Sequence, residues 1–105
     1  MNELAQAAEA RIGQTLKGKY RLEKLLGVGG MAAVYAATHR NGKSLAVKLL
    51  HPQLSAIAAF RERFLREGYV ANKVKHPGAV SVLDDDTSDD GSVYLVMELL
   101  VGETL

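Results

Sequence analysis

The chain has 105 residues, of which 48% are apolar, and a formal net charge of +1. This composition predicts one small folded domain, and without a basic run it gives no reason to expect nucleic acid or an anionic membrane as a partner. The chain has no cysteine, which excludes disulfides and is compatible with a reducing, intracellular setting. It has neither a signal-peptide pattern nor an apolar run near the roughly 18 residues of a membrane-spanning helix.

Residues 1–19 are expected to be a leader that precedes the domain of residues 20–105. Leu4, Ala8 and Ile12 stand four apart in a stretch rich in Ala, Glu and Gln, which favours a short helix ending at Gly13. Because isolated helices shorter than about 12–15 residues are marginal in water, a disordered leader is the alternative. The remaining residues, 13–19, are predicted to be a linker.

Three strands are predicted next, over residues 20–26, 33–38 and 44–50. The first enters a glycine-rich turn, and Asn41-Gly42 between the other two is a strong hairpin signal, because both residues tolerate positive φ. The third strand is apolar on both faces, which indicates that both are covered.

One helix and two further strands complete the pattern. Residues 55–74 have helical periodicity, with an apolar stripe made by Phe60, Phe64, Ala71 and Val74. His76-Pro77-Gly78 would end this helix. Strands are predicted over 79–83 and 93–98, with an acidic loop, 84–92, whose spacing does not match a calcium site. The predicted fold is therefore α+β, a five-stranded antiparallel sheet with one major packed helix.

Two charged residues interrupt the apolar patterns. Lys48 is flanked by Ala46 and Leu50 on its own face of the strand, and Glu67 fills a gap in the helical stripe. A buried, unpaired charge costs several kcal/mol. An ion pair between Lys48 and Glu67 would give each of these two charges a partner. The alternative is that Lys48 reaches out to an edge and Glu67 lies on the rim of the stripe.

The glycine-rich segment is Gly27-Val28-Gly29-Gly30-Met31-Ala32-Ala33-Val34-Tyr35. Glycine lets backbone N–H groups approach phosphate closely, and a lysine held by a glutamate can present its ammonium to the same phosphates. With these features the chain resembles the small lobe of a bacterial, eukaryotic-like serine/threonine protein kinase. Four further motifs stand in the family's order, namely Ala46-Val47-Lys48, Arg63-Phe64-Leu65-Arg66-Glu67, His76-Pro77 and Val93-Tyr94-Leu95-Val96-Met97-Glu98.

The resemblance implies a set of site residues. Lys48 and Glu67 would be the catalytic pair, with Lys48 on the α- and β-phosphates of ATP and Glu67 orienting it. Met97 would be the gatekeeper, and Glu98 to Leu100 would offer backbone groups to adenine. The residues implied to bind ATP are Gly27, Val28, Gly29, Gly30, Met31, Ala32, Val34, Ala46, Lys48, Met97, Glu98 and Leu100.

The sequence departs from the family pattern in two ways. The third loop glycine is Ala32, which restricts φ. The sequence also has no His-Arg-Asp loop and no Asp-Phe-Gly segment, so it lacks the expected base and the ligands for Mg²⁺. We therefore expect a fragment that is inactive alone, while the complete cytoplasmic kinase would use ATP, Mg²⁺ and a protein substrate.

Two other functions remain open. A non-catalytic interaction module would expose lobe faces through which it could associate with itself or with another kinase. A dinucleotide-binding domain would also fit Gly27-x-Gly29-x-x-Ala32, but it requires a helix directly after the glycines and an acid about 20 residues on. No Asp or Glu occurs between Lys24 and Arg61.

Overall fold

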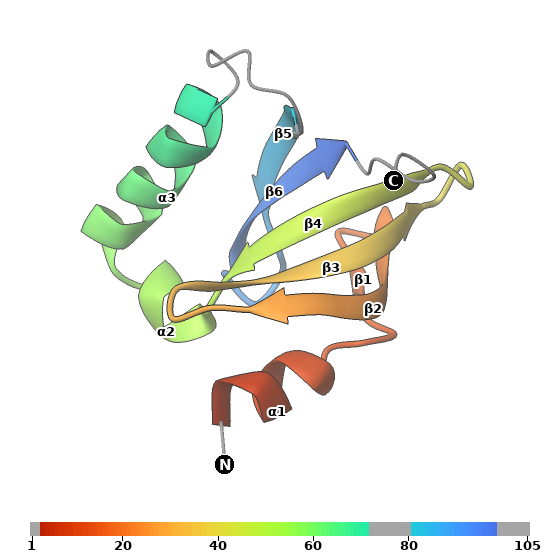
Figure 1. Ribbon diagram of the computed structural model, residues 1–105, viewed down its shortest axis with the longest axis horizontal. Coiled ribbons are helices and arrows are strands. Elements are labelled where there is room, and N and C mark those ends of the chain that lie inside the picture. Colours follow the sequence, from red (N-terminus) through yellow and green to blue (C-terminus); the bar gives the residue numbers. More distant parts are fainter. Residues whose placement is uncertain (1–2, 72–80, 99–105) are drawn as a thin grey trace.

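The computed structural model describes residues 3–71 and 81–98, in which one antiparallel sheet carries helices at its sides (Figure 1). The sheet has six strands in the order β1-β2-β3-β4-β6-β5. The strands are β1 (Thr15–Leu16), β2 (Tyr20–Val28), β3 (Ala32–His39), β4 (Ser44–Leu50), β5 (Val82–Thr87) and β6 (Val93–Glu98). The helices are α1 (Glu3–Glu9), α2 (Pro52–Ser55) and α3 (Ala58–Ala71). The predicted α+β class is confirmed.

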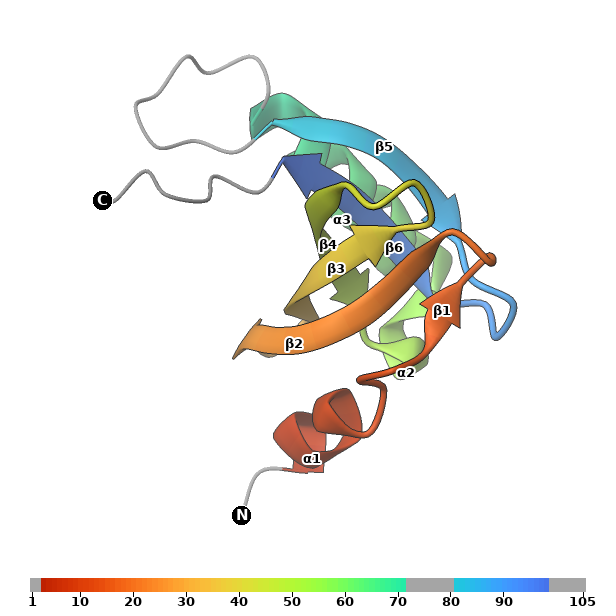
Figure 2. The same cartoon turned by 90° about the vertical axis from the view of Figure 1, so that its right-hand side faces the viewer.

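Strand alternation divides the sheet into two faces. On β3, β4 and β6 the buried side chains of one face, here called the closed face, are Ala33, Tyr35, Ala37, Leu45, Val47, Leu49, Tyr94 and Val96. On the other face, here called the pocket face, Ala32, Leu50, Val93 and Leu95 pack with Phe64 of α3. Figure 2 shows the curled sheet with β1 and β2 in front and α3 behind it. Successive side chains of one strand therefore have different environments.

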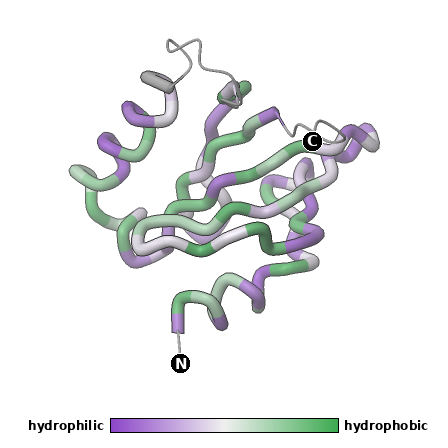
Figure 3. The backbone as a smooth tube through the Cα atoms, viewed as in Figure 1, coloured by the Kyte–Doolittle hydropathy of each residue, from purple (hydrophilic) through white to green (hydrophobic). Residues whose placement is uncertain are grey.

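The predicted β3–β4 hairpin is present. Thr38 pairs with Ser44, Gly42 has φ 93°, and the N–H of Lys43 donates to Asn41 Oδ1 at 2.9 Å. Polar residues gather at this turn (Figure 3). Strands β4 and β6 have the predicted bounds, because turn or strand-breaking residues flank β4 and an apolar run defines β6.

The expected linker instead contains β1. Thr15 and Leu16 pair with Arg21 and Tyr20 of β2, which adds a sixth strand to the five predicted. Lys17 and Gly18 make the turn with φ of 53° and 67°. Because Lys17 is a rare positive-φ residue without a turn-forming side chain, only Gly18 marked this turn in the sequence.

The prediction for the acidic segment was wrong in its first half. Asp84, Asp85 and Asp86 belong to β5, where they pair with Val96, Leu95 and Tyr94 of β6. Strand β5 is at the edge of the sheet, with a neighbouring strand on one side only. Edge strands commonly carry charged side chains, so a run of aspartates is compatible with this position. The loop that remains covers residues 88–92.

The predicted long helix is divided. Ser55 ends α2, and α3 begins at Ala58. The hydroxyl of Ser55 donates to the carbonyl of Leu50 at 3.2 Å and accepts the N–H of Val93 at 3.1 Å, so it fixes the end of β4 to β6. The predicted end of this helix, at residues 72–74, and the His76-Pro77-Gly78 turn lie outside the described residues.

Helix α1 packs against the closed face. Ala8 is buried, and the hydroxyl of Tyr35 donates to its carbonyl at 2.8 Å. Arg11 forms an ion pair with Asp90 at 3.1 Å. Partial burial would raise the pKa of the Asp90 carboxyl, but hydrogen bonds from Ser88 and Ser92, with Arg11, hold that pKa well below its usual range. Among the described helices, none has the length and apolar character to cross a membrane.

Candidate functional site

A pocket of about 480 Å³ lies between the glycine turn, the pocket face and α3. It is lined by Gly27, Val28, Gly29, Met31, Ala32, Val34, Lys48, Phe64, Glu67, Gly68, Val82, Leu95 and Met97. The fold thus brings both proposed catalytic residues and most of the proposed ATP-binding residues to one hollow.

The glycine turn is a tight hairpin between β2 and β3. The N–H of Gly29 donates to the carbonyl of Ala32 at 2.8 Å, which leaves Gly30 and Met31 at the tip. Within the part of the chain that the structure describes, no hydrogen bond uses the N–H groups of Gly30 and Met31. Two neighbouring free amides at a turn suit an anion such as phosphate.

Ala32, at the position of the third family glycine, is 7% exposed and packs with Leu50 and Phe64. Its methyl group therefore adds to the core beneath the pocket. Ala32 lies in β3, where extended backbone suits any residue, so the loss of glycine causes no strain at this position.

Lys48 points from β4 into the pocket. Val34 of β3 and Leu95 of β6 are its register partners, and its ammonium lies 6.0 Å from the centre of the Phe64 ring. A cation near an aromatic face gains about 0.5–1 kcal/mol at an exposed site. Lys48 is exposed and belongs to none of the ion pairs of the described residues, so its charge is available to a ligand.

The predicted ion pair between Lys48 and Glu67 is absent from the structure. Glu67 instead accepts a hydrogen bond and ion pair from Arg63 Nε at 3.0 Å, one helical turn away, and its side chain is 61% exposed. The prediction assumed that both charges were buried. Because the pocket admits solvent to both, neither charge requires the other.

The adenine side of the proposed site is partly present. Val28, Val34 and Met97 line the pocket, whereas Gly30, Ala46 and Glu98 do not. Ala46 is buried and pairs with Met97 in the sheet. Leu100 lies outside the described residues.

Sequence reasoning did not assign four pocket-lining residues, Phe64, Gly68, Val82 and Leu95. Gly68 permits a close approach, since a Cβ at this position would lie 2.5 Å from Leu95 Cδ1. A glycine inside a helical pattern was the available signal. The alternation of β6 also places Leu95 on the same face as Met97.

Two alternatives can be compared with this geometry. The dinucleotide-binding alternative is wrong, because strand β3, not a helix, follows the glycines. As for a metal site, the described residues contain no group of three or more His, Cys, Asp or Glu side chains placed to hold a metal ion.

No protein-family profile matches the chain, but individual proteins do. The serine/threonine-protein kinase PknA of Mycobacterium tuberculosis is 42% identical over 100 residues, covering 90% of this chain and 23% of PknA. The kinase pkn3 of Myxococcus xanthus is 36% identical over 95 residues, covering 90% of this chain and 17% of pkn3. The chain thus spans about a fifth of the length of these relatives.

The fold agrees with these sequence relatives. The crystal structure of the Mycobacterium tuberculosis PknI kinase domain superposes with a TM-score of 0.62 at 33% identity, covering 85% of this chain and 36% of that domain. The chain is therefore a homologue of bacterial serine/threonine-protein kinases and corresponds to the N-terminal, small lobe of their kinase domain.

Proposed function

We propose that the pocket binds ATP, with its phosphates between the glycine turn and Lys48 and its adenine against Val28, Val34 and Met97. The observation that carries this proposal is that the ammonium of Lys48, which has no ion-pair partner among the described residues, shares one hollow with the glycine turn. Charge-assisted hydrogen bonds from an ammonium to phosphate are roughly twice as strong as neutral ones. The apolar side chains of the same hollow suit a flat, aromatic base.

Glu67 has a conditional role in this proposal. In the structure one of its oxygens, Oε2, is paired with Arg63, so Glu67 orients Lys48 only when its carboxylate also reaches the ammonium or leaves Arg63. The Arg63–Glu67 pair spans one helical turn and is exposed, and such pairs contribute only about 0.3–0.5 kcal/mol. Bound phosphate and a small movement of α3 would therefore give Glu67 a new partner at a small cost in free energy.

The activity of a whole kinase requires more groups than this lobe contains. By analogy with the relatives, we propose that a complete protein carrying it transfers the γ-phosphoryl group of ATP, with Mg²⁺, to a protein hydroxyl in the cytoplasm. This sequence supplies neither the base nor the metal ligands of that reaction.

Self-association also stays a prediction. It is supported by two exposed apolar side chains, Leu83 on β5 and Ile57 before α3.

The test is the effect of ATP with Mg²⁺ on the melting temperature of the 105-residue chain. Lys48→Met retains the length of the side chain but removes the charge, and we expect it to weaken ATP binding about tenfold or more, since a hydrogen bond to a charged group contributes about 1.5–3 kcal/mol. Lys43→Met, at the exposed β3–β4 turn, is the matched control and should leave the ATP-induced shift unchanged. Equal shifts in wild type and Lys48→Met would refute this placement of the phosphates.

A further inference from the structure

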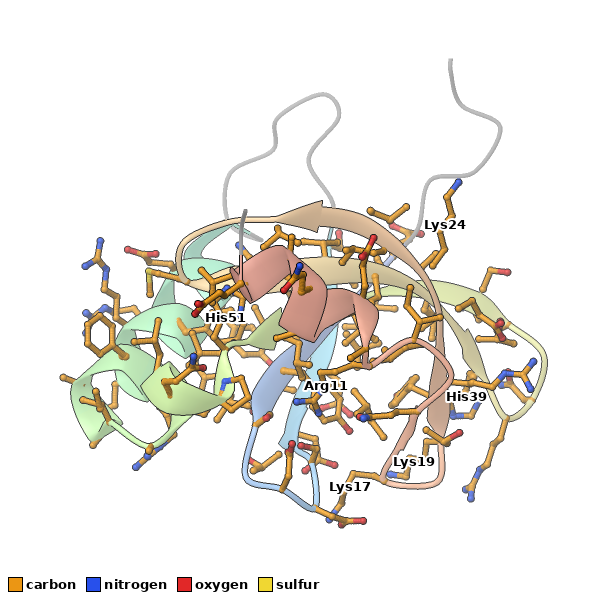
Figure 4. All side chains as sticks on the ribbon, turned by 90° about the horizontal axis from the view of Figure 1, so that it is seen from below. Arg11, Lys17, Lys19, Lys24, His39 and His51 are labelled. Carbon is orange, nitrogen blue, oxygen red and sulfur yellow. The ribbon has the colours of Figure 1, made fainter. Side chains whose placement is uncertain are left out.

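His51 is a buried, polar residue that lies outside the pocket. It follows β4 directly and is 6% exposed. Its ring nitrogen Nε2 is 2.8 Å from the carbonyl oxygen of Gly29, and its backbone N–H donates to the carbonyl of Met31 at 2.9 Å. One residue thus holds two carbonyls of the glycine turn. In Figure 4, His51 lies beside α1.

The hydrogen bond to Gly29 defines which nitrogen of the His51 ring carries a proton. A carbonyl oxygen only accepts hydrogen bonds, so Nε2 must carry the proton. The contact is partly buried, and His51 also lines a second, smaller cavity of about 150 Å³ with Leu4 and Ala7 of α1 and with Leu49 and Pro52. The contact is partly shielded from water, and loss of the Nε2–H donor would leave the Gly29 carbonyl without this partner, so the bond restrains the turn.

The direction of the Gly29 carbonyl has a consequence for the next amide. The described peptide bonds are trans, and in a planar trans peptide the C=O and the following N–H point in opposite directions. With the Gly29 carbonyl directed at His51, the N–H of Gly30 points away from His51. This N–H is one of the two at the tip of the turn that form no hydrogen bond within the described ranges, 3–71 and 81–98.

We propose that His51 is a positioning residue for phosphate binding, which sets the peptide plane of Gly29-Gly30 and thereby aims the N–H of Gly30 at the phosphates of the nucleotide. The inference rests on the proposed ATP-binding function. His51 does not line the nucleotide pocket, so it acts through the glycine turn and not by touching the ligand. The glycines allow the backbone of the turn several conformations, and the hydrogen bonds to His51 stabilise one of them.

The test compares two amide side chains of different length. In His51→Gln the side-chain N–H₂ can reach the position of Nε2, whereas in His51→Asn the same group is one methylene shorter and cannot. We expect His51→Asn to weaken ATP binding about tenfold, and His51→Gln to stay within about threefold of wild type, the difference being one ordered hydrogen bond. Adenosine, which has no phosphate, should bind all three proteins alike in calorimetric titrations.

The outcomes separate this inference from a general loss of stability. A purely structural role would weaken ATP and adenosine together, and the inference would then be wrong. Equal ATP affinity for the Asn and Gln variants would overturn it as well. Rescue by Gln combined with a selective loss of ATP affinity in Asn would support it.

A measurement without nucleotide distinguishes failure of this inference from failure of the proposed function. Nitrogen-15 NMR of the wild-type chain should show the Nε2–H tautomer of His51, and the amide signals of Gly30 and Met31 should shift in His51→Asn but not in His51→Gln. If these signals behave as expected but ATP does not bind, the ATP proposal fails and the control of the turn by His51 stands. An Nδ1–H tautomer, which can be observed in the wild type even if a variant does not fold, would overturn the inference.

Discussion

The two faces of the sheet differ sharply although the same strands build them. On β4, Leu49 of the closed face is 2% exposed, and its neighbour Lys48 on the pocket face is exposed. Tyr35 and Tyr94 are fully buried on the closed face, where burial raises the pKa of both hydroxyls. The pocket face instead keeps a hollow of about 480 Å³. The closed face is thus packed throughout, whereas the pocket face packs in part against α3 and leaves charge and backbone donors accessible to a ligand.

This contrast shows why stability and binding can be separated in so small a domain. Well-packed side chains supply most of the free energy of folding, whereas a binding site needs groups that stay unpaired until the ligand arrives. Alternation along a strand places the two tasks on adjacent residues.

The largest expected effect comes from neighbouring residues of β4. Leu49→Ala should reduce the free energy of unfolding by about 2–5 kcal/mol, because it leaves a cavity in the closed face. Lys48→Ala should change it by no more than about 1 kcal/mol, since Lys48 is exposed, forms no ion pair among the described residues and loses only its contact with the Phe64 ring. Urea unfolding measures both. Similar losses of unfolding free energy in the two variants would contradict the difference between the closed face and the pocket face.

A pair of tyrosines tests the polar groups within the closed face. Tyr35→Phe removes the hydrogen bond to Ala8 and should destabilise the chain by about 1 kcal/mol, with faster hydrogen exchange in α1. Tyr94 Oη is buried without a hydrogen-bond partner among the described residues, so Tyr94→Phe should stabilise by up to about 1 kcal/mol. Thermal unfolding of both variants is the measurement, and a loss of stability in Tyr94→Phe would mean that its hydroxyl has a partner.

The smallest expected effect is the pH dependence of the ion pair between Asp90 and Arg11, which follows α1. The pKa of Asp90 is lowered in the folded state, so its contribution is present above the unfolded-state pKa of about 3.9 and is lost as the pH falls toward the lower, folded-state value. The side chain of Asp90 is 51% exposed, which limits this contribution to about 1 kcal/mol or less. Asp90→Asn should therefore flatten the acid limb of a plot of stability against pH. An unchanged acid limb would assign the acid sensitivity to other carboxylates.

Much of the fold could be predicted from local signals. The Asn41-Gly42 turn, the bounds of β4 and β6 and the class of the fold follow from turn chemistry and apolar runs, which act over a few residues. The missed strand β1 and the charged strand β5 gain their hydrogen bonds from partners elsewhere in the sheet. A segment of two residues, or one rich in aspartate, has no apolar alternation or β-branched run from which such pairing could be predicted.

The sequence by itself determined which chemical groups this chain can bring to a ligand, namely a glycine turn, a strand lysine and a helix glutamate, and the order in which they occur. Only the tertiary structure decided which of them are buried and which pair. It left Lys48 open to the pocket, joined Glu67 to Arg63 and placed His51 against the carbonyl of Gly29. The physical reason is that burial and pairing depend on how segments that are distant in the sequence pack together, which no short stretch of sequence specifies.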